Sequence, residues 1–309
     1  MRGRKVEGAG KPEVIEVGGD GPLLIIHGGA GKRLHEMSAE QAREVDEALA
    51  RSLEAGYALL RDGAPAQDAV VAAIRVMEDA ECFNCGRGAA LTLDGTVEHD
   101  SSIMLGDGSC GAACGLVSAR HPIDVACAVM ERTPHVLFSE PTPAQLDDWG
   151  IERVPNDYFV TARRARDLAE FRERSAMGLD DSSTRHGTVG AVARDAAGRI
   201  AAATSTGGIT GQMPGRVGDS PIIGAGTYAN QDGVAVSCTG TGEKFVQESA
   251  AFQLHARVSF AGQPLADAAG STLAAVGERS GNGGVIALGA RGAGVIGRMA
   301  DAQMNYAWA

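Results

Sequence analysis

Aromatic residues and clustered positive charge are both scarce in this sequence. Aromatic side chains make up 4% of its 309 residues, and the formal net charge is −11 at pH 7. A negative chain repels phosphate backbones and anionic lipid, and no segment joins a Lys/Arg cluster to the aromatic platforms of nucleic-acid grooves. The composition therefore argues against nucleic acid as a partner and favours a small-molecule or peptide substrate.

Long hydrophobic runs are lacking too. Residues 1–8 are charged and glycine-rich, unlike the apolar run of a secretion signal, and no later segment is long enough to span a bilayer. Hydrophobic residues still make up 44% of the chain, which is ample for a sizeable core. We therefore expect a globular cytoplasmic protein without a membrane partner.

Cysteine is sparse, because six cysteines in a chain of this length are too few for a disulfide framework. Cys82 and Cys85 form a C-x-x-C pair, but no second pair stands at the spacing of a zinc site. The pair is either a metal or redox motif or two free thiols packed in a reducing compartment. We prefer the free thiols, since a single motif of this length is weak.

The first half of the chain alternates between strand and helix patterns. Residues 22–26 predict a buried strand, which runs into His27–Gly31, where the backbone must turn tightly or approach another group closely. Capping, turn and periodicity signals predict the following elements. They are a helix from Ser38 to Arg61 stopped by Gly63, a helix from Pro65 to Met77, hairpins within 89–119 turning at Asp94-Gly95 and at 106–108, a helix over 122–131 and a surface helix over 156–174.

A polar segment, residues 175–187, then interrupts the pattern and predicts a mobile linker, because it has no hydrophobic period. The second half is rich in glycine and in short apolar runs. Its candidate strands are 188–194, 200–205, 222–228, 234–239, 284–288 and 294–298, with helices at about 243–258 and 264–276. Sheets flanked by helices on both sides of the linker predict a layered sandwich.

A turn at 195–198 joins two strands whose ends carry hydroxyl groups. If the strands pair directly on either side of this turn, Thr188 lies opposite or diagonal to Ser205 and Thr206. Cross-strand partners are about 4.5 to 5.5 Å apart at Cβ, so two hydroxyls can hydrogen-bond there. Threonine pairs are also common in sheet packing, and the spacing by itself leaves both interpretations open.

A threonine hydroxyl needs a base to become a nucleophile, and no His-Asp pair stands near Thr188 at a recognisable spacing. Its own α-amine would serve, because a free α-amino group titrates at about 7.7 to 8.0. That requires cleavage after Gly187, which offers no side-chain bulk and tolerates strain. His186 is either a base for this cleavage or simply solvated.

Two further groups predict the remaining parts of a hydrolytic site. The strand over 234–239 ends at Gly240, so backbone N–H groups and the Thr239 hydroxyl point outward at a strand-to-helix junction, as oxyanion donors would. A plain glycine-rich turn is the alternative. Arg216 and Asp219 stand three residues apart and can hold the carboxylate and ammonium of an amino acid, or form a surface ion pair.

Together and in this order, these features resemble the plant-type L-asparaginase and isoaspartyl peptidase family. The resemblance runs from His27 almost to the C-terminus, and several motifs of this length in one order are highly specific. The motifs are His27–Gly31, Phe83-Asn84, Met130–His135, His186–Val192, Thr204–Gly208, Gly215–Pro221 and Thr239-Gly240. Two departures are Cys85, where the family has a small alanine, and a longer extension before Pro22.

The resemblance implies an α+β fold, the four-layer αββα sandwich of the N-terminal-nucleophile (Ntn) hydrolases, in a single domain over 1–309. It also implies autocleavage into an α subunit, 1–187, and a β subunit, 188–309, that assemble as an (αβ)₂ heterotetramer. Such enzymes hydrolyse L-asparagine to aspartate and ammonia and cleave β-aspartyl dipeptides through an acyl-enzyme.

The resemblance also implies residue roles, position by position. These are Thr188 as nucleophile, Thr206 as its supporting hydroxyl, Thr239 and Gly240 as oxyanion donors, Arg216 and Asp219 as substrate anchors, Gly242 as a further ammonium contact, and Asn84 beside the nucleophile. No cofactor is implied for catalysis. A structural sodium ion is implied on the backbone carbonyls of Met77, Glu78, Ala80, Phe83, Cys85 and Arg87.

Other interpretations stay open at this stage. Glycosylasparaginases and threonine aspartases of the same superfamily typically carry Asp at the position of Gly187, so L-asparagine and isoaspartyl dipeptides lead as substrates. A protein of a different class, a binding module of the same fold, would keep the chain uncut before Thr188. The sequence does not rank the two substrates, because both present the same aspartyl group to Arg216 and Asp219.

Overall fold

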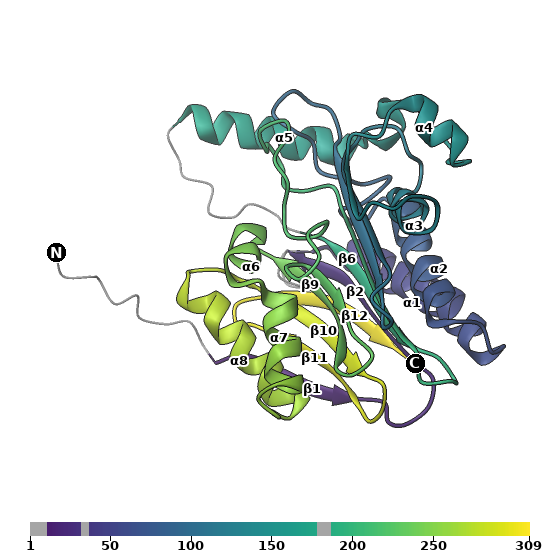
Figure 1. Ribbon diagram of the computed structural model, residues 1–309. Coiled ribbons are helices and arrows are strands. Elements are labelled where there is room, and N and C mark those ends of the chain that lie inside the picture. Colours follow the sequence, from purple (N-terminus) through teal and green to yellow (C-terminus); the bar gives the residue numbers. More distant parts are fainter. Residues whose placement is uncertain (1–10, 32–36, 178–186) are drawn as a thin grey trace.

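The computed structural model describes residues 11–31, 37–177 and 187–309, which form a mixed α+β fold with two β-sheets (Figure 1). Most of the expected linker, residues 178–186, lies outside the described residues, and its first residues, Ser175 and Ala176, belong to a helix. Within the described part of the chain, no helix is both long and apolar enough to cross a membrane.

The chain alternates between the two sheets and their helices. In chain order the elements are β1 (Glu13–Val17), β2 (Leu23–Gly31), α1 (Ala39–Arg61), α2 (Ala66–Asp79), β3 (His99–Leu105), β4 (Cys110–Leu116), α3 (Pro122–Arg132), β5 (Leu137–Ser139), α4 (Pro143–Asp148), η2 (Asn156–Phe159), α5 (Ala162–Ala176), β6 (Val189–Arg194), β7 (Ile200–Thr206), β8 (Thr227–Ala229), β9 (Val234–Gly240), α6 (Gly242–Glu248), α7 (Ala250–Ser259), α8 (Leu265–Glu278), β10 (Gly283–Gly289), β11 (Gly294–Arg298) and β12 (Gln303–Trp308).

The two sheets face each other across a buried apolar layer. One has the strand order β12-β2-β6-β7-β3-β4-β5 and the other β1-β11-β10-β9-β8, and only β4 and β5 pair in parallel. Ile25 and Val192 from the first sheet cluster with Ile286 and Ile296 from the second. Alternation along each strand therefore sends one set of side chains into this layer and the other set toward the helices.

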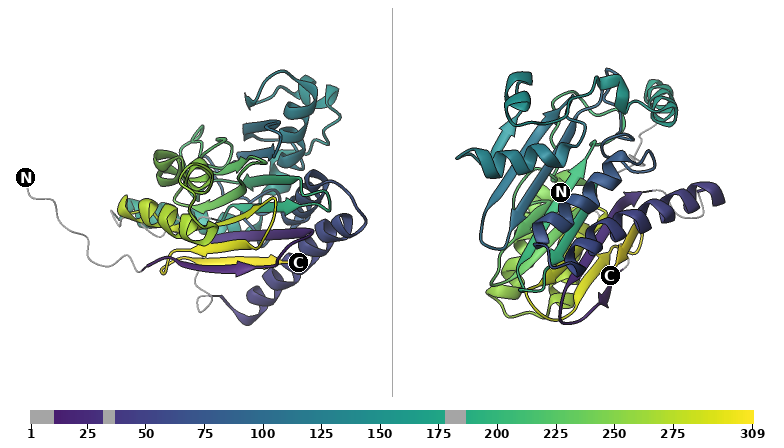
Figure 2. Two further views of the ribbon diagram at one scale, coloured as in Figure 1. Left: turned by 60° about the horizontal axis from the view of Figure 1, so that its bottom comes forward. Right: turned by 90° about the vertical axis from the view of Figure 1, so that its right-hand side faces the viewer.

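Helices cover the outer face of each sheet (Figure 2). Helices α1, α2 and α3 pack on the seven-stranded sheet through a cluster that includes Leu24, Ile74 and Ile123. Helices α7 and α8 pack on the five-stranded sheet through Leu254 and Leu273. The expectation of sheets with helices on both sides is thus confirmed at the level of a mixed α+β fold.

The start of α1 is the capping box that the sequence predicts. The Ser38 hydroxyl accepts the Gln41 N–H, the Gln41 side chain accepts the Ser38 N–H, and Gly63 follows the helix with a φ of 86°. Pro65 is the N-cap of α2, as its position suggests. Local signals of this kind fix the helix ends before any tertiary contact is considered.

Two expectations in the first half are wrong. No strand precedes the Asp94-Gly95 turn; the Gly95 N–H instead donates to Thr92 O in a loop that continues to β3. The helix expected over 156–174 is split, because a 3-10 turn at its start ends before Thr161, whose hydroxyl caps α5 by accepting the Arg164 N–H. In both places a side-chain or turn hydrogen bond offers the backbone an alternative partner.

Two expectations in the second half are also wrong. The strand expected over 222–228 is confined to β8, since the Ala225 N–H bonds to Ile222 O in a turn. The helix expected at about 243–258 divides into α6 and α7 at Ser249, which takes a left-handed conformation with a φ of 48°. No glycine or proline marks this break in the sequence.

The N-terminal extension supplies an edge strand that sequence patterns do not reveal. Strand β1 pairs antiparallel with β11, while the C-terminal strand β12 pairs with β2. The Arg194 guanidinium secures this end of the molecule by donating to the carbonyls of Gly21 and Gly289, at 2.7 and 3.0 Å. The extension is therefore part of the five-stranded sheet.

Candidate active site

The site begins with the hairpin of β6 and β7. Val189 pairs with Ser205, so Thr188 at the start of the hairpin lies opposite Thr206, as the turn predicts. The Thr188 hydroxyl donates to the Thr206 hydroxyl oxygen over 3.1 Å, and that oxygen also accepts the Gly208 N–H at 3.1 Å. Both threonines are buried. The register therefore places a hydroxyl relay at the strand end.

The peptide bond before Thr188 is packed between the backbone of Gly29 on one side and the side chain of Asn84 on the other. A Cβ on Gly29, whose φ is 95°, would stand 2.5 Å from the Gly187 carbonyl carbon. A Cβ on Gly187 would stand 2.7 Å from the Asn84 Cβ. The segment His27–Gly31 thus continues β2 and serves as a close approach, without a tight turn.

Asn84 holds the loops around Thr188 in place. Its side-chain amide donates to Gly208 O at 2.6 Å and its side-chain oxygen accepts the Ala90 N–H at 2.6 Å. Its own carbonyl accepts the Gly207 N–H at 2.9 Å. With both ends of the amide engaged, Asn84 fixes the segment after β7 and does not line the pocket.

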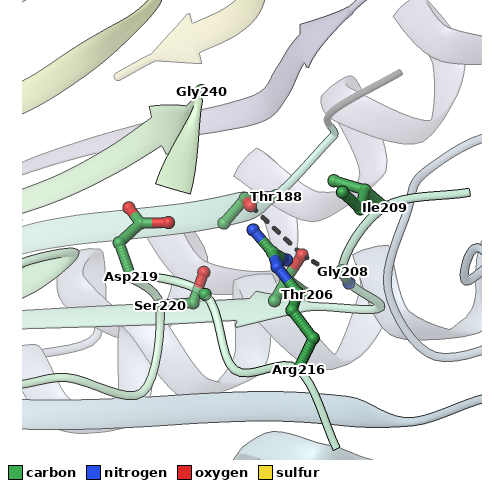
Figure 3. Close-up of a pocket in the computed structure, with 9 residues that line it drawn as sticks. Thr188, Thr206, Gly208, Ile209, Arg216, Asp219, Ser220 and Gly240 are labelled. Carbon is green, nitrogen blue, oxygen red and sulfur yellow. Dashed lines mark hydrogen bonds between the residues drawn. The ribbon is translucent and has the colours of Figure 1, made fainter. Parts of the chain in front are cut away.

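A small pocket opens beside Thr188 (Figure 3). The residues that line it come from four separate segments of the second half. They are Thr188, Thr206, Gly208, Ile209, Arg216, Gly218, Asp219, Ser220 and Gly240. Arg216 and Asp219 lie on opposite sides of Thr188 in this view, so a bound zwitterion can reach both anchors and the hydroxyl.

The two anchors are not paired with each other. The Arg216 guanidinium directs its Nε and one Nη to a single carboxylate oxygen of Glu243, at 3.0 and 2.9 Å. Asp219 is buried, and desolvation raises its pKa to about 7 although the positive charge of Arg216 opposes the shift. Gly242 adjoins both anchors, since a Cβ there would stand 2.9 Å from Asp219 Oδ1.

The expected oxyanion donors lie at the end of β9. The Thr239 oxygen accepts the Ala30 N–H at 3.0 Å, which leaves its own O–H available as a donor. Gly240 lines the pocket with a φ of 148°, and a Cβ there would stand 2.1 Å from Asn282 O. Thr239 itself is fully buried, and of the two only Gly240 lines the pocket that holds Thr188.

His27 is a buried neighbour of the site that also hydrogen-bonds to the backbone of Thr188. Burial lowers its pKa to about 3, so the imidazole is neutral, and its Nε2 lies 3.0 Å from the Ser237 hydroxyl. The Ser237 hydroxyl in turn hydrogen-bonds to the Thr204 hydroxyl at 2.7 Å, and both belong to a layer of hydroxyl groups between the sheets. His27 is therefore a structural member of that layer.

The segment expected to hold sodium has suitable oxygen donors. Among the described residues, no group of three or more His, Cys, Asp or Glu side chains could hold a metal ion, so an ion here needs backbone carbonyls. A Cβ on Gly86 would stand 2.1 Å from Glu78 O, and one on Gly88 would stand 2.5 Å from Phe83 O. Carbonyls crowd these glycines, and hard oxygen ligands of this kind fit an alkali cation.

Cys82 and Cys85 are free thiols, as are the other cysteines. Burial raises the pKa of Cys82 to about 12 and that of Cys85 well above its ordinary value. Thiols so reluctant to ionise do not suit a redox motif.

Sequence reasoning missed two polar partners of Arg216. Glu243 is one, and the Gln212 amide oxygen, 3.5 Å from an Arg216 Nη, is the other. Glu243 had one signal, an acidic residue in the first turn of a helix that begins at Gly242. Gln212 had none, because its role depends on the fold of the loop after β7.

The fold and the site together define a class: an α+β protein with two hydrogen-bonded threonine hydroxyls and two ionic side chains, Arg216 and Asp219, around one pocket. The chain belongs to the asparaginase family, whose model matches residues 20–309. It is 44% identical over 279 residues to an isoaspartyl peptidase of Salmonella typhimurium, covering 86% of this chain and 88% of that protein.

Two further relatives carry related names. An isoaspartyl peptidase of Escherichia coli is 42% identical over 279 residues, with 86% of each chain covered. The human isoaspartyl peptidase/L-asparaginase is 40% identical over 228 residues, with 73% of each chain covered. The resemblance found in the sequence motifs is thereby confirmed as family membership.

Proposed function

We propose that this protein is a hydrolase of L-asparagine and β-aspartyl dipeptides that matures by cutting its own chain between Gly187 and Thr188. The observation that carries the proposal is the Thr188 hydroxyl donating to Thr206 at 3.1 Å in a pocket that also holds Arg216 and Asp219. The names of the relatives in the bacterial and human proteomes support these substrates.

Maturation begins with the Thr188 hydroxyl attacking the Gly187 carbonyl carbon. The C–N bond breaks as the acyl group moves to oxygen, the proton of the hydroxyl ends on the released α-amine, and water then hydrolyses the ester. The bare backbone of Gly29 against that carbonyl leaves room for the tetrahedral carbon. The products are a new C-terminus at Gly187 and a free amine on Thr188.

Catalysis then uses the same hydroxyl against the substrate. The free α-amine of Thr188 accepts the hydroxyl proton, the oxygen attacks the side-chain amide carbonyl, and the amine or ammonia leaves with that proton. Thr239 and Gly240 stabilise the oxyanion, while Arg216 and Asp219 hold the carboxylate and ammonium. Water releases aspartate from Thr188 by the reverse proton path.

The architecture that goes with this function is the αββα sandwich of the Ntn hydrolases. Two facing sheets with helices on their outer faces support it, as does the family match. We assign residues 1–187 to an α subunit and 188–309 to a β subunit of one domain, and propose an (αβ)₂ assembly. Sedimentation of matured protein tests the assembly through its mass.

A sodium ion bound at the end of α2 and in the loop that follows would stabilise the segment that carries Asn84. The carbonyls of Met77, Glu78, Ala80, Phe83, Cys85 and Arg87 would hold it, and the crowding of Glu78 O and Phe83 O against glycines supports this set. The ion would be held by these carbonyl oxygens and would take no step in catalysis. No cofactor enters the proposed reaction.

The proposal is tested on purified protein by denaturing gel and mass spectrometry. Two fragments that meet at Gly187/Thr188 are expected after incubation, with release of ammonia from L-asparagine and of the free amino acid from an isoaspartyl dipeptide. Thr188→Ala should stay one chain and hydrolyse neither. A single intact band with full activity would remove Thr188 as nucleophile, and an intact inactive protein that binds aspartate would point to a binding module.

A further inference from the structure

The loop that carries both substrate anchors rests on one face of β3. We call residues 215–220 the anchor loop, because it contains Arg216 and Asp219. Three hydrogen bonds join it to alternate residues of the segment that starts β3. They are Gly215 N–H to Glu98 Oε2 at 2.9 Å, Gly218 N–H to Asp100 Oδ2 at 3.5 Å, and the Ser102 hydroxyl to the Ser220 carbonyl at 2.6 Å.

The spacing of these contacts follows from strand geometry. Residues two apart on a strand share one face, so Asp100 and Ser102 point to the same side of β3, and Glu98 directly precedes the strand at the same spacing. Asp100 is the cross-strand partner of Thr206, whose side chain on that face meets Thr188. The face that presents the nucleophile pair thus also presents the supports of the anchor loop.

Asp100 is the central support and is held on two sides. Only 5% of its surface is exposed, and its Oδ1 accepts the Gly115 N–H at 3.1 Å while its Oδ2 faces Gly218. A buried carboxylate kept in place by backbone N–H groups has little freedom to move. The fixed position of Asp100 on β3 therefore restricts the position of Gly218 in the anchor loop.

Near Arg216 the anchor loop is held by turn hydrogen bonds as well as by β3: the Arg216 N–H donates to Met213 O at 3.0 Å, and Asp219 O accepts the Ile222 N–H at 3.0 Å. Gly215, with a φ of 80°, and Gly218 have no side chains, so their backbone groups are what β3 can hold. Arg216 lies between these two glycines in the sequence, and Asp219 directly follows Gly218. The distance between the guanidinium and the carboxylate consequently depends on where β3 places the two N–H groups.

We propose that Glu98, Asp100 and Ser102 are positioning residues that hold the anchor loop and so determine KM for aspartyl substrates while leaving kcat nearly unchanged. This inference rests on the proposed function, since it assigns the anchors to that substrate. None of the three lines the pocket or touches the reacting atoms.

The charge of Asp100 gives the proposal a distinctive signature. Burial raises the pKa of Asp100 to about 6, against the hydrogen bonds from Gly115 and Gly218 and the charge of Arg216. The other titratable groups that face it or its neighbours are Glu98, Cys114, Glu140 and Asp219. Above pH 6 the carboxylate is charged and attracts both N–H groups, that of Gly115 at 3.1 Å and that of Gly218 at 3.5 Å; below pH 6 it is neutral and the contribution of the charge is lost.

The test compares the KM for L-asparagine of matured variants and wild type at pH 8 and pH 5. Asp100→Asn should raise KM about tenfold at pH 8, the effect of one hydrogen bond to a charged group, with kcat within about twofold. The ratio of variant to wild-type KM should fall toward about one at pH 5, where wild-type Asp100 is already neutral. Groups that do not interact with Asp100 cancel in this ratio. Asp219 does interact, because the charge of Asp100 contributes to raising its pKa, and the two pH values are therefore chosen on either side of its titration at about 7.

Ser102→Ala is the informative companion variant. It removes a support without a titrating group, so its KM ratio should be raised by about fivefold at both pH values. Asp107→Asn in the same hairpin is the matched control, because Asp107 is exposed and accepts only the Ser109 N–H of its own turn. Its KM and kcat should equal those of wild type at both pH values.

Three results would overturn the inference: an unchanged KM for Asp100→Asn, a fall in kcat without a change in KM, or a KM ratio equal at pH 5 and pH 8. If Asp100→Asn fails to fold, Glu98→Gln, at the partly exposed end of the set, takes its place with a smaller rise in KM. Wild-type protein without any hydrolytic activity would instead refute the proposed function. The role of Glu98, Asp100 and Ser102 would then be tested by measuring the dissociation constant for L-aspartate of each variant by calorimetry. The expected ratios of variant to wild type are the same as for KM.

Discussion

Arg216 gives its Nε and one Nη to the same carboxylate oxygen of Glu243, at 3.0 and 2.9 Å, and gives neither to Asp219. A guanidinium has two edges for bidentate contacts, and Glu243 occupies the side edge. The end edge is therefore the one that a substrate carboxylate can use. Glu243 thus orients Arg216 and, with its own negative charge, opposes the substrate that Arg216 is to bind.

Glu243→Gln should lower KM for L-asparagine by about threefold. The substitution removes the opposing charge but keeps a side-chain oxygen that can accept from Arg216, and the pair is half exposed on the Glu243 side, so the effect is small. The same change should lower the pKa of Asp219, because the charge of Glu243 contributes to raising it. Steady-state kinetics between pH 5 and pH 9 measures both effects.

Glu248→Gln is the control for this prediction, because Glu248 lies on the same helix and pairs with Arg279. Its kinetics should match wild type. A rise in KM for Glu243→Gln would mean that orientation of Arg216 outweighs the repulsion.

Asp219 should make substrate binding weaker in acid. Its pKa of about 7 means that the carboxyl is neutral below that pH and no longer attracts the ammonium of the substrate. KM for L-asparagine should therefore rise as the pH falls through 7. In Asp219→Asn, KM should be high at every pH and lose this component of the pH dependence, which a series of KM values from pH 5 to pH 9 will show.

The same group has an opposite effect on stability. Asp219 has an ordinary pKa of 3.8 and a folded-state pKa of about 7, so the folded protein binds the extra proton between these values. The free energy of unfolding thus falls as the pH rises through this window. Asp219→Asn should melt at a higher temperature than wild type at pH 8 and at a similar temperature at pH 4. A lower melting temperature at pH 8 would contradict the burial argument.

Local signals in the sequence were sufficient for the nucleophile hairpin. The turn at 195–198, with Gly198 at a φ of 78°, fixes the pairing of Val189 with Ser205 and hence the meeting of Thr188 with Thr206. The capping box at Ser38 fixed the start of α1 in the same way. In each case the information lies within a few residues and acts through backbone geometry.

Partners far apart in the chain were beyond sequence reasoning. Glu243 meets Arg216 only because α6 and the anchor loop converge on the pocket, and Asn84 reaches Gly208 O across 124 positions. The edge strand β1 was missed because its burial pattern is mostly exposed, so its sequence lacks a clear apolar alternation. The break at Ser249 was missed because a non-glycine residue adopts a left-handed conformation there.

Thr206 should support turnover through its hydroxyl group. Thr206→Ala removes the acceptor of the Thr188 O–H and leaves the Gly208 N–H without its partner, so kcat should fall by about tenfold or more. Thr206→Ser keeps the oxygen and should retain most of the activity. Turnover of matured protein, with melting temperatures to confirm folding, measures the effect, and equal kcat values for the Ala and Ser variants would exclude the relay.

Sodium should stabilise the loop after α2 more than other cations of equal charge do. Glu78 O accepts the Arg87 N–H at 2.7 Å and keeps a second lone pair for an ion, and Phe83 O lies close to Gly88. The melting temperature should therefore be higher in sodium chloride than in choline chloride at one ionic strength. Identical melting curves in the two salts, and in a titration of sodium into salt-free protein, would remove the ion from the proposal.

Gly29 should be essential for cleavage of the chain at Gly187. An alanine there would bring its Cβ to 2.5 Å from the Gly187 carbonyl carbon and 2.7 Å from its oxygen, in a backbone with a φ of 95°. The carbonyl under attack would have to move, so Gly29→Ala should slow the appearance of fragments by at least about tenfold, as loss of alignment does in other reactions.

Gly63→Ala separates this steric effect from backbone strain. Gly63 has a φ of 86°, close to that of Gly29, yet a Cβ there would meet nothing within 4 Å. Both variants should lose about 1–2 kcal/mol of stability to the left-handed conformation, but only Gly29→Ala should be cleaved more slowly than wild type. A time course on denaturing gels distinguishes them. If the two variants were cleaved at the same rate, strain alone would explain the glycine, and the close approach to Gly187 would have no part in maturation.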